Sequence, residues 1–168
     1  MIMLFSVAIS GALLAAGSVV WSQQARRERE HELLLIGNEF RRAIGLYYER
    51  TPGAVKRYPE KLEGLLRDDR YLSTQRYLRR LYRDPMTGKS EWELVQAPGG
   101  GITGIYSLSN GEPIKTRGFD EVDKDFEGKS RYSDWRFVYT PPPPTGAPRS
   151  KPPTALKGSI GQLVLASK

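Results

Sequence analysis

The spacing of apolar and polar residues changes along the chain, and each change predicts a different element. Residues 1–21 contain no charged side chain and no proline, and they continue into a polar stretch without a signal that would stop a helix. A helix of that length reaches about 31 Å, close to the roughly 30 Å hydrocarbon core of a bilayer. We expect residues 1–21 to be the transmembrane half of a longer helix, because a single span must satisfy its backbone within lipid.

A second pattern follows directly, with apolar residues at steps of three and four, which is typical of an amphipathic helix with one buried stripe. The stripe comprises Leu33, Ile36, Phe40, Ala43, Ile44 and Tyr47. Pro52 and Gly53 then end the pattern. The sequence therefore predicts one continuous helix over residues 2–49, whose second half supports a folded head.

Two short helices are expected after this long one. Pro59 stands where a first helical turn tolerates proline and precedes leucines on one face, which predicts a helix over residues 59–67. Ser73 can cap a second helix. Its inner face comprises Tyr77, Leu78 and Leu81, and its outer face carries Arg76, Arg79, Arg80 and Arg83. We interpret the arginines as a solvated face; the alternative is a partner-binding patch, because arginine suits bidentate contact with carboxylate or phosphate.

From residue 91 the apolar residues alternate with polar ones, which predicts strands. The expected strands cover residues 91–96, 102–109, 113–116 and 134–139. Asn110 and Gly111 favour a two-residue hairpin turn, since both of its central positions need positive φ. Together with the helices, this pattern predicts an α+β fold in which a long N-terminal helix packs on a small antiparallel β-sheet head.

The last residues, 141–168, differ in composition from the rest. They open with four prolines, which must be extended, and few large apolar residues follow, so this tail is expected to be disordered. The alternative is that residues 160–166 dock as a late strand. The chain has a net charge of +7, and the tail holds four basic residues and no acidic one. We therefore attribute much of the charge to the tail, do not favour nucleic-acid binding, and divide the chain into residues 1–21, 22–140 and 141–168.

The chain offers little catalytic chemistry. It contains no cysteine and a single histidine, His31, so thiol catalysis and thiolate metal sites are excluded. Motifs for an activated nucleophile or a two-histidine zinc helix are absent. The glycines at 99–101 lack the lysine and the helix start that a phosphate loop needs. We do not expect an enzyme.

The N-terminus has a rival interpretation as a cleavable secretory signal with small residues near position 16 as its cleavage site. Such a signal needs a basic leader and an apolar run that ends at the cut, and the run continues to Trp21. We therefore favour retention in the membrane. The arginines at 26, 27 and 29 would draw the C-terminal side toward the cytoplasm by the positive-inside rule, which leaves orientation open.

One acidic segment has the spacing of a calcium loop. Oxygen ligands at positions 1, 3, 5 and 12 would come from Asp123, Asp125, Glu127 and Asp134, with Gly128 at position 6. Position 5 is longer and position 12 shorter than the usual residue, and no flanking helices are predicted. We favour an acidic solvated loop and keep calcium as a hypothesis, in which the ion would order the last strand.

Several short motifs occur in an informative order between residues 4 and 140. After the apolar helix that runs into a charged one come Tyr58-Pro59-x-x-Leu62, Asp84-Pro85-Met86-Thr87-Gly88, Pro98-Gly99-Gly100-Gly101 and Ile105-Tyr106-Ser107-Leu108-Ser109-Asn110-Gly111. This order resembles the pseudopilins of bacterial type II secretion systems, above all their major, G-type subunit.

The resemblance implies a pilin-like head in the periplasm, a single span in the bacterial inner membrane, and helical assembly into a filament that helps to drive folded proteins across the outer membrane. It implies further copies of the chain, other pseudopilins and the inner-membrane secretion platform as partners. Helices of neighbouring copies would bury an assembly stripe comprising Leu33, Ile36, Phe40 and Ile44. The family's major subunit also resembles a calcium binder in its C-terminal loop, which here would involve Asp123, Asp125 and Asp134.

Part of the family pattern is missing. Pseudopilins carry a short basic leader, a Gly-Phe-Thr cleavage junction and a glutamate at the fifth mature position, and residues 1–4 show none of these. Alignment of residues 7–11 with the family's apolar segment leads us to expect a chain that starts a few residues late, so leader processing is assigned to no residue. Two other functions stay open: a DNA-uptake pilin or other nucleic-acid-binding surface protein, and a single-span periplasmic adaptor that does not polymerise.

Overall fold

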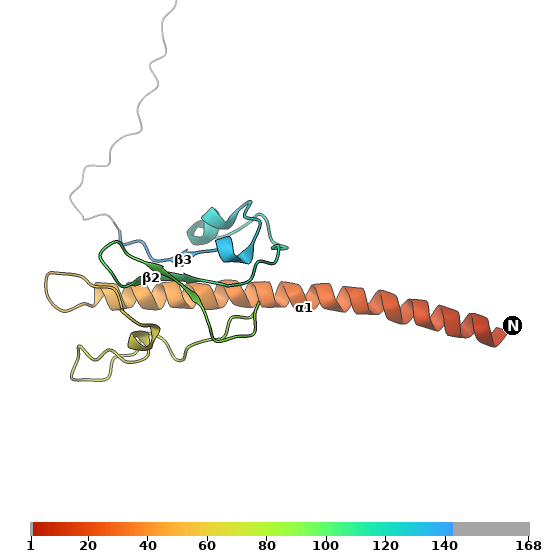
Figure 1. Cartoon of the computed structure of the whole chain (residues 1–168), viewed down its shortest axis with the longest axis horizontal. Helices are drawn as coiled ribbons and strands as arrows, with labels where there is room; N and C mark the ends of the chain where they lie inside the picture. Colours follow the sequence, from red (N-terminus) through yellow and green to blue (C-terminus); the bar gives the residue numbers. More distant parts are fainter. Residues whose placement is uncertain (1, 143–168) are drawn as a thin grey trace, which may run out of the picture.

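The long N-terminal helix forms as predicted. The computed structural model describes the backbone of residues 2–142 and the side chains of residues 21–142. Helix α1 (Ile2–Glu49) contains 48 residues and is the longest element in Figure 1; its length is about 72 Å at the standard rise. Its C-terminal end is closed locally, because the Thr51 hydroxyl donates to the Tyr47 carbonyl at 3.1 Å and the Lys56 ammonium donates to the Glu49 carbonyl at 2.7 Å.

A small antiparallel sheet lies along the second half of α1 (Figure 1). Strand β1 (Glu93–Gln96) pairs with β2 (Ile102–Tyr106), and β2 pairs with β3 (Phe137–Val138), in the order β1-β2-β3. The turn before β2 needs Gly101, because its φ is 85° and an added Cβ would lie 2.7 Å from the Tyr58 Cβ. The α+β class with one long helix and a small sheet is confirmed.

The core of the head forms where the apolar stripe of α1 meets the sheet. Leu33, Phe40 and Ile44 are fully buried, and the Phe40 ring lies 5.6 Å from the Trp92 ring between centroids. Gly45 allows the Tyr139 ring to approach the helix closely, since a Cβ there would lie 2.7 Å from that ring. Helix and sheet thus share one core, and the second half of α1 is an integral part of the head.

The two predicted short helices are only partly present. The first is reduced to a single 3-10 turn, η1 (Leu62–Leu65), and the second is absent, since residues 73–83 follow an irregular path. Their backbone finds partners outside a helix, because the amides of Tyr77 and Leu78 both donate to the Leu65 carbonyl. The predicted inward face is nevertheless correct, because Leu78 is buried and Tyr77 and Leu81 pack against the core.

The predicted strands are shorter, and one does not form. The chain leaves β2 at Tyr106, Asn110-Gly111 forms no hairpin, and residues 113–116 are not a strand. The hydroxyl of Ser107 accepts from the Ser109 amide and that of Ser109 from the Gly111 amide, so side chains replace the expected ladder. The last strand keeps two residues, because η3 (Tyr132–Asp134) occupies its predicted start.

Two predicted segments are described only in part. The tail is described only at Pro141 and Pro142, and the apolar run 1–21 has a described side chain only at Trp21. Among the side chains that the structure does describe, no helix has the length and apolar character needed to cross a membrane.

Candidate assembly surfaces

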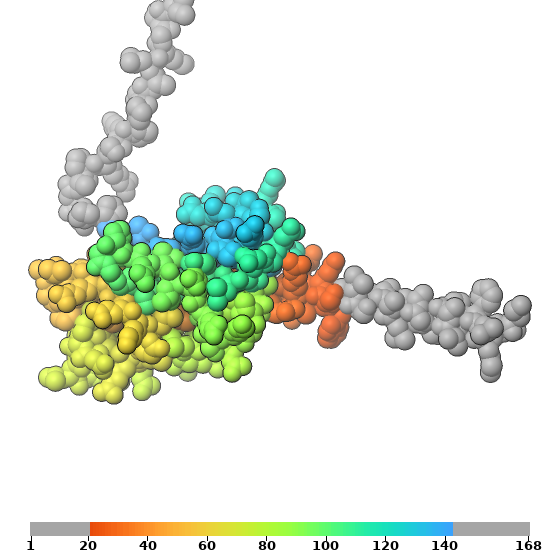
Figure 2. Space-filling view, viewed as in Figure 1, coloured from red at the N-terminus to blue at the C-terminus, as the bar shows by residue number. Residues whose placement is uncertain are grey.

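The first half of α1 extends beyond the head. In Figure 1 the helix continues well past the sheet toward its N-terminus, and Figure 2 shows the first described side chains emerging from under the head. Near the point where the helix leaves the head, the Arg26 guanidinium donates to the Glu112 carbonyl. Residues 2–25 would measure about 36 Å at the standard helical rise, and within the described side chains Trp21 is 79% exposed. The N-terminal part of the helix therefore extends past its own head.

A buried glutamate holds the head on α1 near the point where the helix leaves it. Glu30 is 4% exposed, and its carboxylate accepts from the amides of Ile114 and Lys115 and from the Tyr132 hydroxyl, each at 2.8 Å. Burial, and then the bond to Glu30, raise the pKa of Tyr132. These bonds explain why residues 113–116 form no strand, since their amides use the carboxylate as acceptor.

A second contact between helix and head uses one of the predicted calcium ligands. Asp123 is buried at the start of η2 (Glu121–Phe126); its two carboxylate oxygens accept from the Arg41 guanidinium and the Asn38 amide, each at 2.7 Å. Arg41 also lies 5.6 Å from the centroid of the Phe137 ring. Asp123 therefore connects α1 to η2, and each of its two carboxylate oxygens already accepts a hydrogen bond from α1.

The four predicted calcium ligands do not come together. Asp125 and Asp134 are exposed and line one open groove of about 670 Å³ with Lys129 and Arg136, whereas Glu127 accepts from the Gly118 amide at 3.2 Å. In the described part of the chain, no group of three or more His, Cys, Asp or Glu residues is arranged to hold a metal ion. Because Asp123 is paired with Arg41, and Arg41, Lys129 and Arg136 all line the groove, this arrangement does not fit a calcium site.

The predicted assembly stripe needs a correction. Leu33, Phe40 and Ile44 are fully buried and Ile36 is 7% exposed, all within the core of their own head. A neighbouring copy cannot cover side chains that the sheet already covers. The 3.6-residue period identified a buried face correctly, and the assignment of that face to a neighbouring subunit is wrong.

The solvent side of α1 carries a second surface, which mixes apolar and charged side chains. Leu35 is 58% exposed, and farther along the helix an open groove of about 370 Å³ runs between α1 and η2. We call it the α1 groove; it is lined by Asn38, Arg41, Arg42, Gly45, Leu46, Glu49, Val122 and Tyr139. Val122, at its edge, is 68% exposed although it is apolar.

On another side of the head, residues 70–83 form what we call the arginine loop. It contains five arginines and no acidic residue. The first, Arg70, is internal: its guanidinium bonds both Asp68 oxygens at 2.7 Å and lies 3.6 Å from the centroid of the Tyr47 ring. Hydrogen bonds from Arg70 and from Tyr77 outweigh the opposing effect of burial and hold the pKa of Asp68 below its ordinary value.

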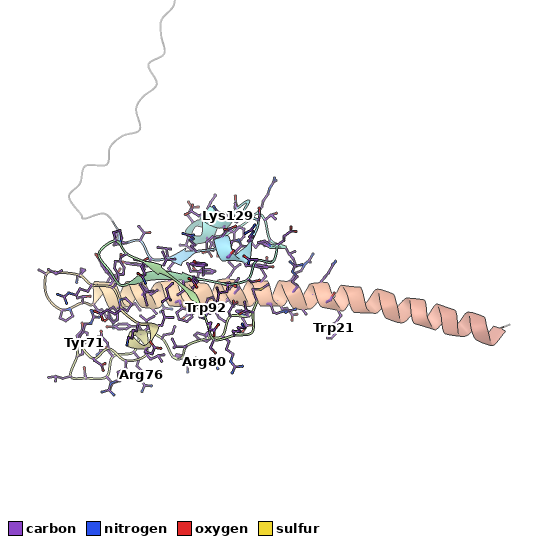
Figure 3. All side chains as sticks on the ribbon, in the orientation of Figure 1. Trp21, Tyr71, Arg76, Arg80, Trp92 and Lys129 are labelled. Atoms are coloured by element: carbon purple, nitrogen blue, oxygen red, sulfur yellow. The ribbon has the colours of Figure 1, made fainter. Side chains whose placement is uncertain are left out.

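The other arginines of this loop face solvent. Arg76, Arg79, Arg80 and Arg83 are exposed, and none of them forms an ion pair with the described residues. Figure 3 shows Tyr71, Arg76 and Arg80 along one edge of the head, away from Lys129. Leu72, in the same loop, is fully exposed. Internal hydrogen bonds thus fix a loop that exposes one leucine and several arginines without ion pairs.

Comparison with known protein families, curated proteins and solved structures found no match for this chain.

Proposed function

We propose that this chain is a structural subunit that is anchored in a membrane by the first half of α1 and assembles with further copies into a filament. The observation that carries the proposal is the length of α1, which exceeds the part that its own head covers. The helix is 48 residues long, and its N-terminal part continues well past the sheet (Figure 1).

A helix that extends beyond its own head needs a partner. Isolated helices are marginal in water, since most helical stability in proteins comes from packing. Residues 2–20 are also almost entirely apolar in sequence, and a large exposed apolar surface is a sign of a membrane or protein contact. Acyl chains before assembly and neighbouring helices after it would both supply such contacts.

The contacts among the motifs support a pseudopilin role in type II protein secretion. Asp84 is buried; its carboxylate accepts from the Met86 amide and the Thr87 hydroxyl of its own motif and from the Ser107 hydroxyl, at 2.7 Å, of another. The Ile102 amide, beside the glycine turn, donates to the Pro59 carbonyl at 2.8 Å. Motifs distant in sequence therefore build one head.

Under this proposal the head lies in the periplasm, the apolar half of α1 spans the bacterial inner membrane once, and the partners are further copies, other pseudopilins and the secretion platform of that membrane. The protein acts by assembly rather than by catalysis. Its binding surfaces are accordingly the protruding half of α1 and the exposed sides of the head.

Electron microscopy of the overproduced full chain tests the proposal. We expect membrane-associated protein and short filaments in the wild type. Leu13→Arg places a charge within the apolar run and should abolish membrane retention and filaments, whereas Gln23→Arg, just beyond the run, should preserve both. Membrane-bound protein that never forms filaments would instead support the non-polymerising adaptor.

The exposed arginines favour one second candidate, a nucleic-acid-binding surface protein such as a DNA-uptake pilin. Unpaired Arg76, Arg79, Arg80 and Arg83 suit phosphate contacts. Fluorescence anisotropy with a DNA duplex separates the two functions, because phosphate binding must weaken steeply as salt increases. The filament proposal expects no measurable affinity at physiological salt.

A further inference from the structure

An open groove lies between the loop that follows α1 and the turn that joins β1 to β2. We call it the tyrosine groove; it measures about 830 Å³, and its lining includes Tyr48, Val55, Tyr58, Pro98 and Gly99. Tyr48 and Tyr58 are half-buried, and their ring centroids lie 4.5 Å apart at an interplanar angle of 30°. Val55 is 70% exposed. Within the described part of the chain, a pair of rings and an apolar side chain are therefore left partly uncovered.

The polar groups of the tyrosine groove suit a neutral ligand that offers carbonyl oxygens. The charges of the lining nearly cancel, since they come from Lys56, Arg57 and Glu60, and the Lys56 ammonium already donates to two backbone carbonyls near the end of α1. Among the described residues, the tyrosine hydroxyls that form hydrogen bonds belong to other positions. The hydroxyls of Tyr48 and Tyr58 and the Arg57 guanidinium are thus the donors that a ligand would meet.

The segment that begins the tail has the matching chemistry. Residues 141–148 read Pro-Pro-Pro-Pro-Thr-Gly-Ala-Pro and contain no charged side chain. A run of prolines favours the polyproline II helix, which has no internal hydrogen bonds and leaves its carbonyl oxygens free as acceptors. Grooves lined by aromatic rings are a recurring receptor for this helix, because it is preformed and loses little entropy on binding.

This segment also starts beside the groove. Strand β3 ends at Val138, and the Tyr139 amide donates to the Thr103 carbonyl at 2.9 Å, which holds the chain at the sheet. The Tyr139 ring lies 5.9 Å from the Tyr48 ring between centroids, so the chain leaves the head next to one wall of the groove. At about 3.1 Å per residue, Pro143 is within about 12 Å of Tyr139.

We propose that residues 143–148 bind in the tyrosine groove of their own copy, with prolines on the rings of Tyr48 and Tyr58 and backbone carbonyls accepting from Arg57. The same copy supplies the segment because a ligand tethered beside its site binds at a high effective concentration. The inference goes beyond the proposed function and does not depend on filament formation.

Limited digestion of the full chain in detergent with trypsin tests the contact. Trypsin cleaves after Arg149, directly beyond the proposed segment, which we call the protected site, and after Lys157, eight residues farther on, which we call the reference site. Cleavage follows the population of the open form when opening is fast, so a segment that is bound most of the time should make the protected site about tenfold slower than the reference site. Mass spectrometry of the released tail peptides measures both rates.

Matched variants separate binding of the segment from folding of the head. Gly99 does not have a positive φ, and an added Cβ would meet no heavy atom within 4 Å beyond its chain neighbours. Gly99→Leu should therefore fill the groove, leave the melting temperature unchanged and raise the rate at the protected site to that at the reference site. Ser90→Leu, at an exposed position outside the groove, should keep the wild-type difference. Serine in place of Pro143 and Pro144 leaves the groove intact and should act like Gly99→Leu.

A cysteine pair determines which copy supplies the segment. The natural chain has no cysteine, so a disulfide reports only the introduced pair, and it forms when the two Cα atoms approach to about 4.4–6.8 Å. Gly99→Cys and Pro144→Cys in one chain should give a disulfide within the monomer, identified by mass spectrometry after mild oxidation. Ser90→Cys with Pro144→Cys is the matched control and should give none.

Each result either supports or overturns the inference. Equal rates at the two sites in the wild type, or protection that survives both Gly99→Leu and the proline replacements, would overturn it. Dimers linked from position 99 of one copy to position 144 of another would assign the groove to the tail of a second copy and overturn binding within one copy. Filaments are scored separately by electron microscopy, so none of these results decides the proposed function.

Discussion

The two halves of α1 share one continuous backbone and have opposite surroundings. From Glu30 to Glu49 the helix is covered on one side by a sheet, aromatic rings and buried carboxylate contacts. Toward its N-terminus the helix extends out of the head, and the Arg26 guanidinium donates to the Glu112 carbonyl near this exit. The comparison shows that the second half belongs to the folding of the monomer. Under our proposal, lipid or other copies stabilise the first half. Each prediction below challenges or sharpens this division of roles.

The largest effect is expected from Phe40→Asp. Phe40 is fully buried between α1 and the sheet, and replacing it by a carboxylate loses the packing of a large side chain, about 3–5 kcal/mol, and leaves an unpaired charge in the core. We expect the head to unfold, as measured by near-ultraviolet circular dichroism of the full chain in detergent. Leu35→Asp, on the exposed side of the same half, is the control and should melt like the wild type. A folded Phe40→Asp head would contradict the assignment of this stripe to the monomer core.

A smaller effect is expected at the point where the halves meet. Glu30→Gln preserves shape but replaces one carboxylate oxygen by an NH2 group, which cannot accept a hydrogen bond. Either the Ile114 amide or the Lys115 amide therefore loses its acceptor, at a cost of about 1–3 kcal/mol. The urea midpoint should fall, and the amides of these two residues should exchange faster with deuterium. Glu28→Gln, at an exposed position two residues earlier, should change neither. Unchanged exchange in Glu30→Gln would show that the carboxylate does not hold this loop.

A pH-dependent effect is expected at the far end of the second half. The folded state lowers the pKa of Asp68 from its ordinary 3.8, so the unfolded chain takes up the proton first as the pH falls. The stabilisation by Asp68 is therefore complete well above pH 4 and is lost as the pH drops through the lowered pKa. Chemical unfolding at several pH values should show that Asp68→Asn destabilises the head at pH 7 and much less at acidic pH. An Asp68→Asn deficit that does not shrink with acid would contradict this pairing with Arg70 and Tyr77.

The smallest effect is expected from calcium. An ion at the predicted loop would have to compete with Arg41 for Asp123, whose two oxygens are already bonded to α1. Millimolar calcium should leave the melting temperature of the full chain in detergent unchanged, and Asp125→Asn should respond in the same way as the wild type. A calcium-dependent rise in the wild type that is absent from Asp125→Asn would restore the calcium hypothesis, since ligands that bind the native state stabilise it.

The sequence predicted features that depend on local periodicity and failed where side chains form long-range bonds. The helix, its buried face and the α+β class follow from apolar spacing, and those predictions are confirmed. Glu30 looked like one charge among many, because its partners Ile114 and Tyr132 are more than eighty residues away. The strand predicted at 113–116 is absent for the same reason, because the Ile114 and Lys115 amides donate to Glu30. Asp123 matched the ligand spacing of a calcium loop, and its ion pair with Arg41 is visible only in the folded structure.

The candidate surfaces divide in the same way. The helical pattern expected after Ser73 placed the arginines at 76–83 on an exposed face, and they are exposed although that helix is absent. The internal role of Arg70 and the exposure of Leu72 became visible only in the folded loop. The assembly stripe was misassigned because periodicity reports that a face is buried and does not report what buries it. The sheet covers that face, so the surfaces left for other copies are the first half of α1 and the exposed sides of the head.

Sedimentation of the full chain, residues 1–168, in buffer without detergent measures most directly whether the first half of α1 needs a partner. We predict that no stable monomer exists under these conditions and that the protein is recovered in membranes, micelles or large assemblies. A monodisperse, folded monomer with the apolar residues 1–21 still attached would contradict the proposal that lipid and neighbouring copies support this half of the helix.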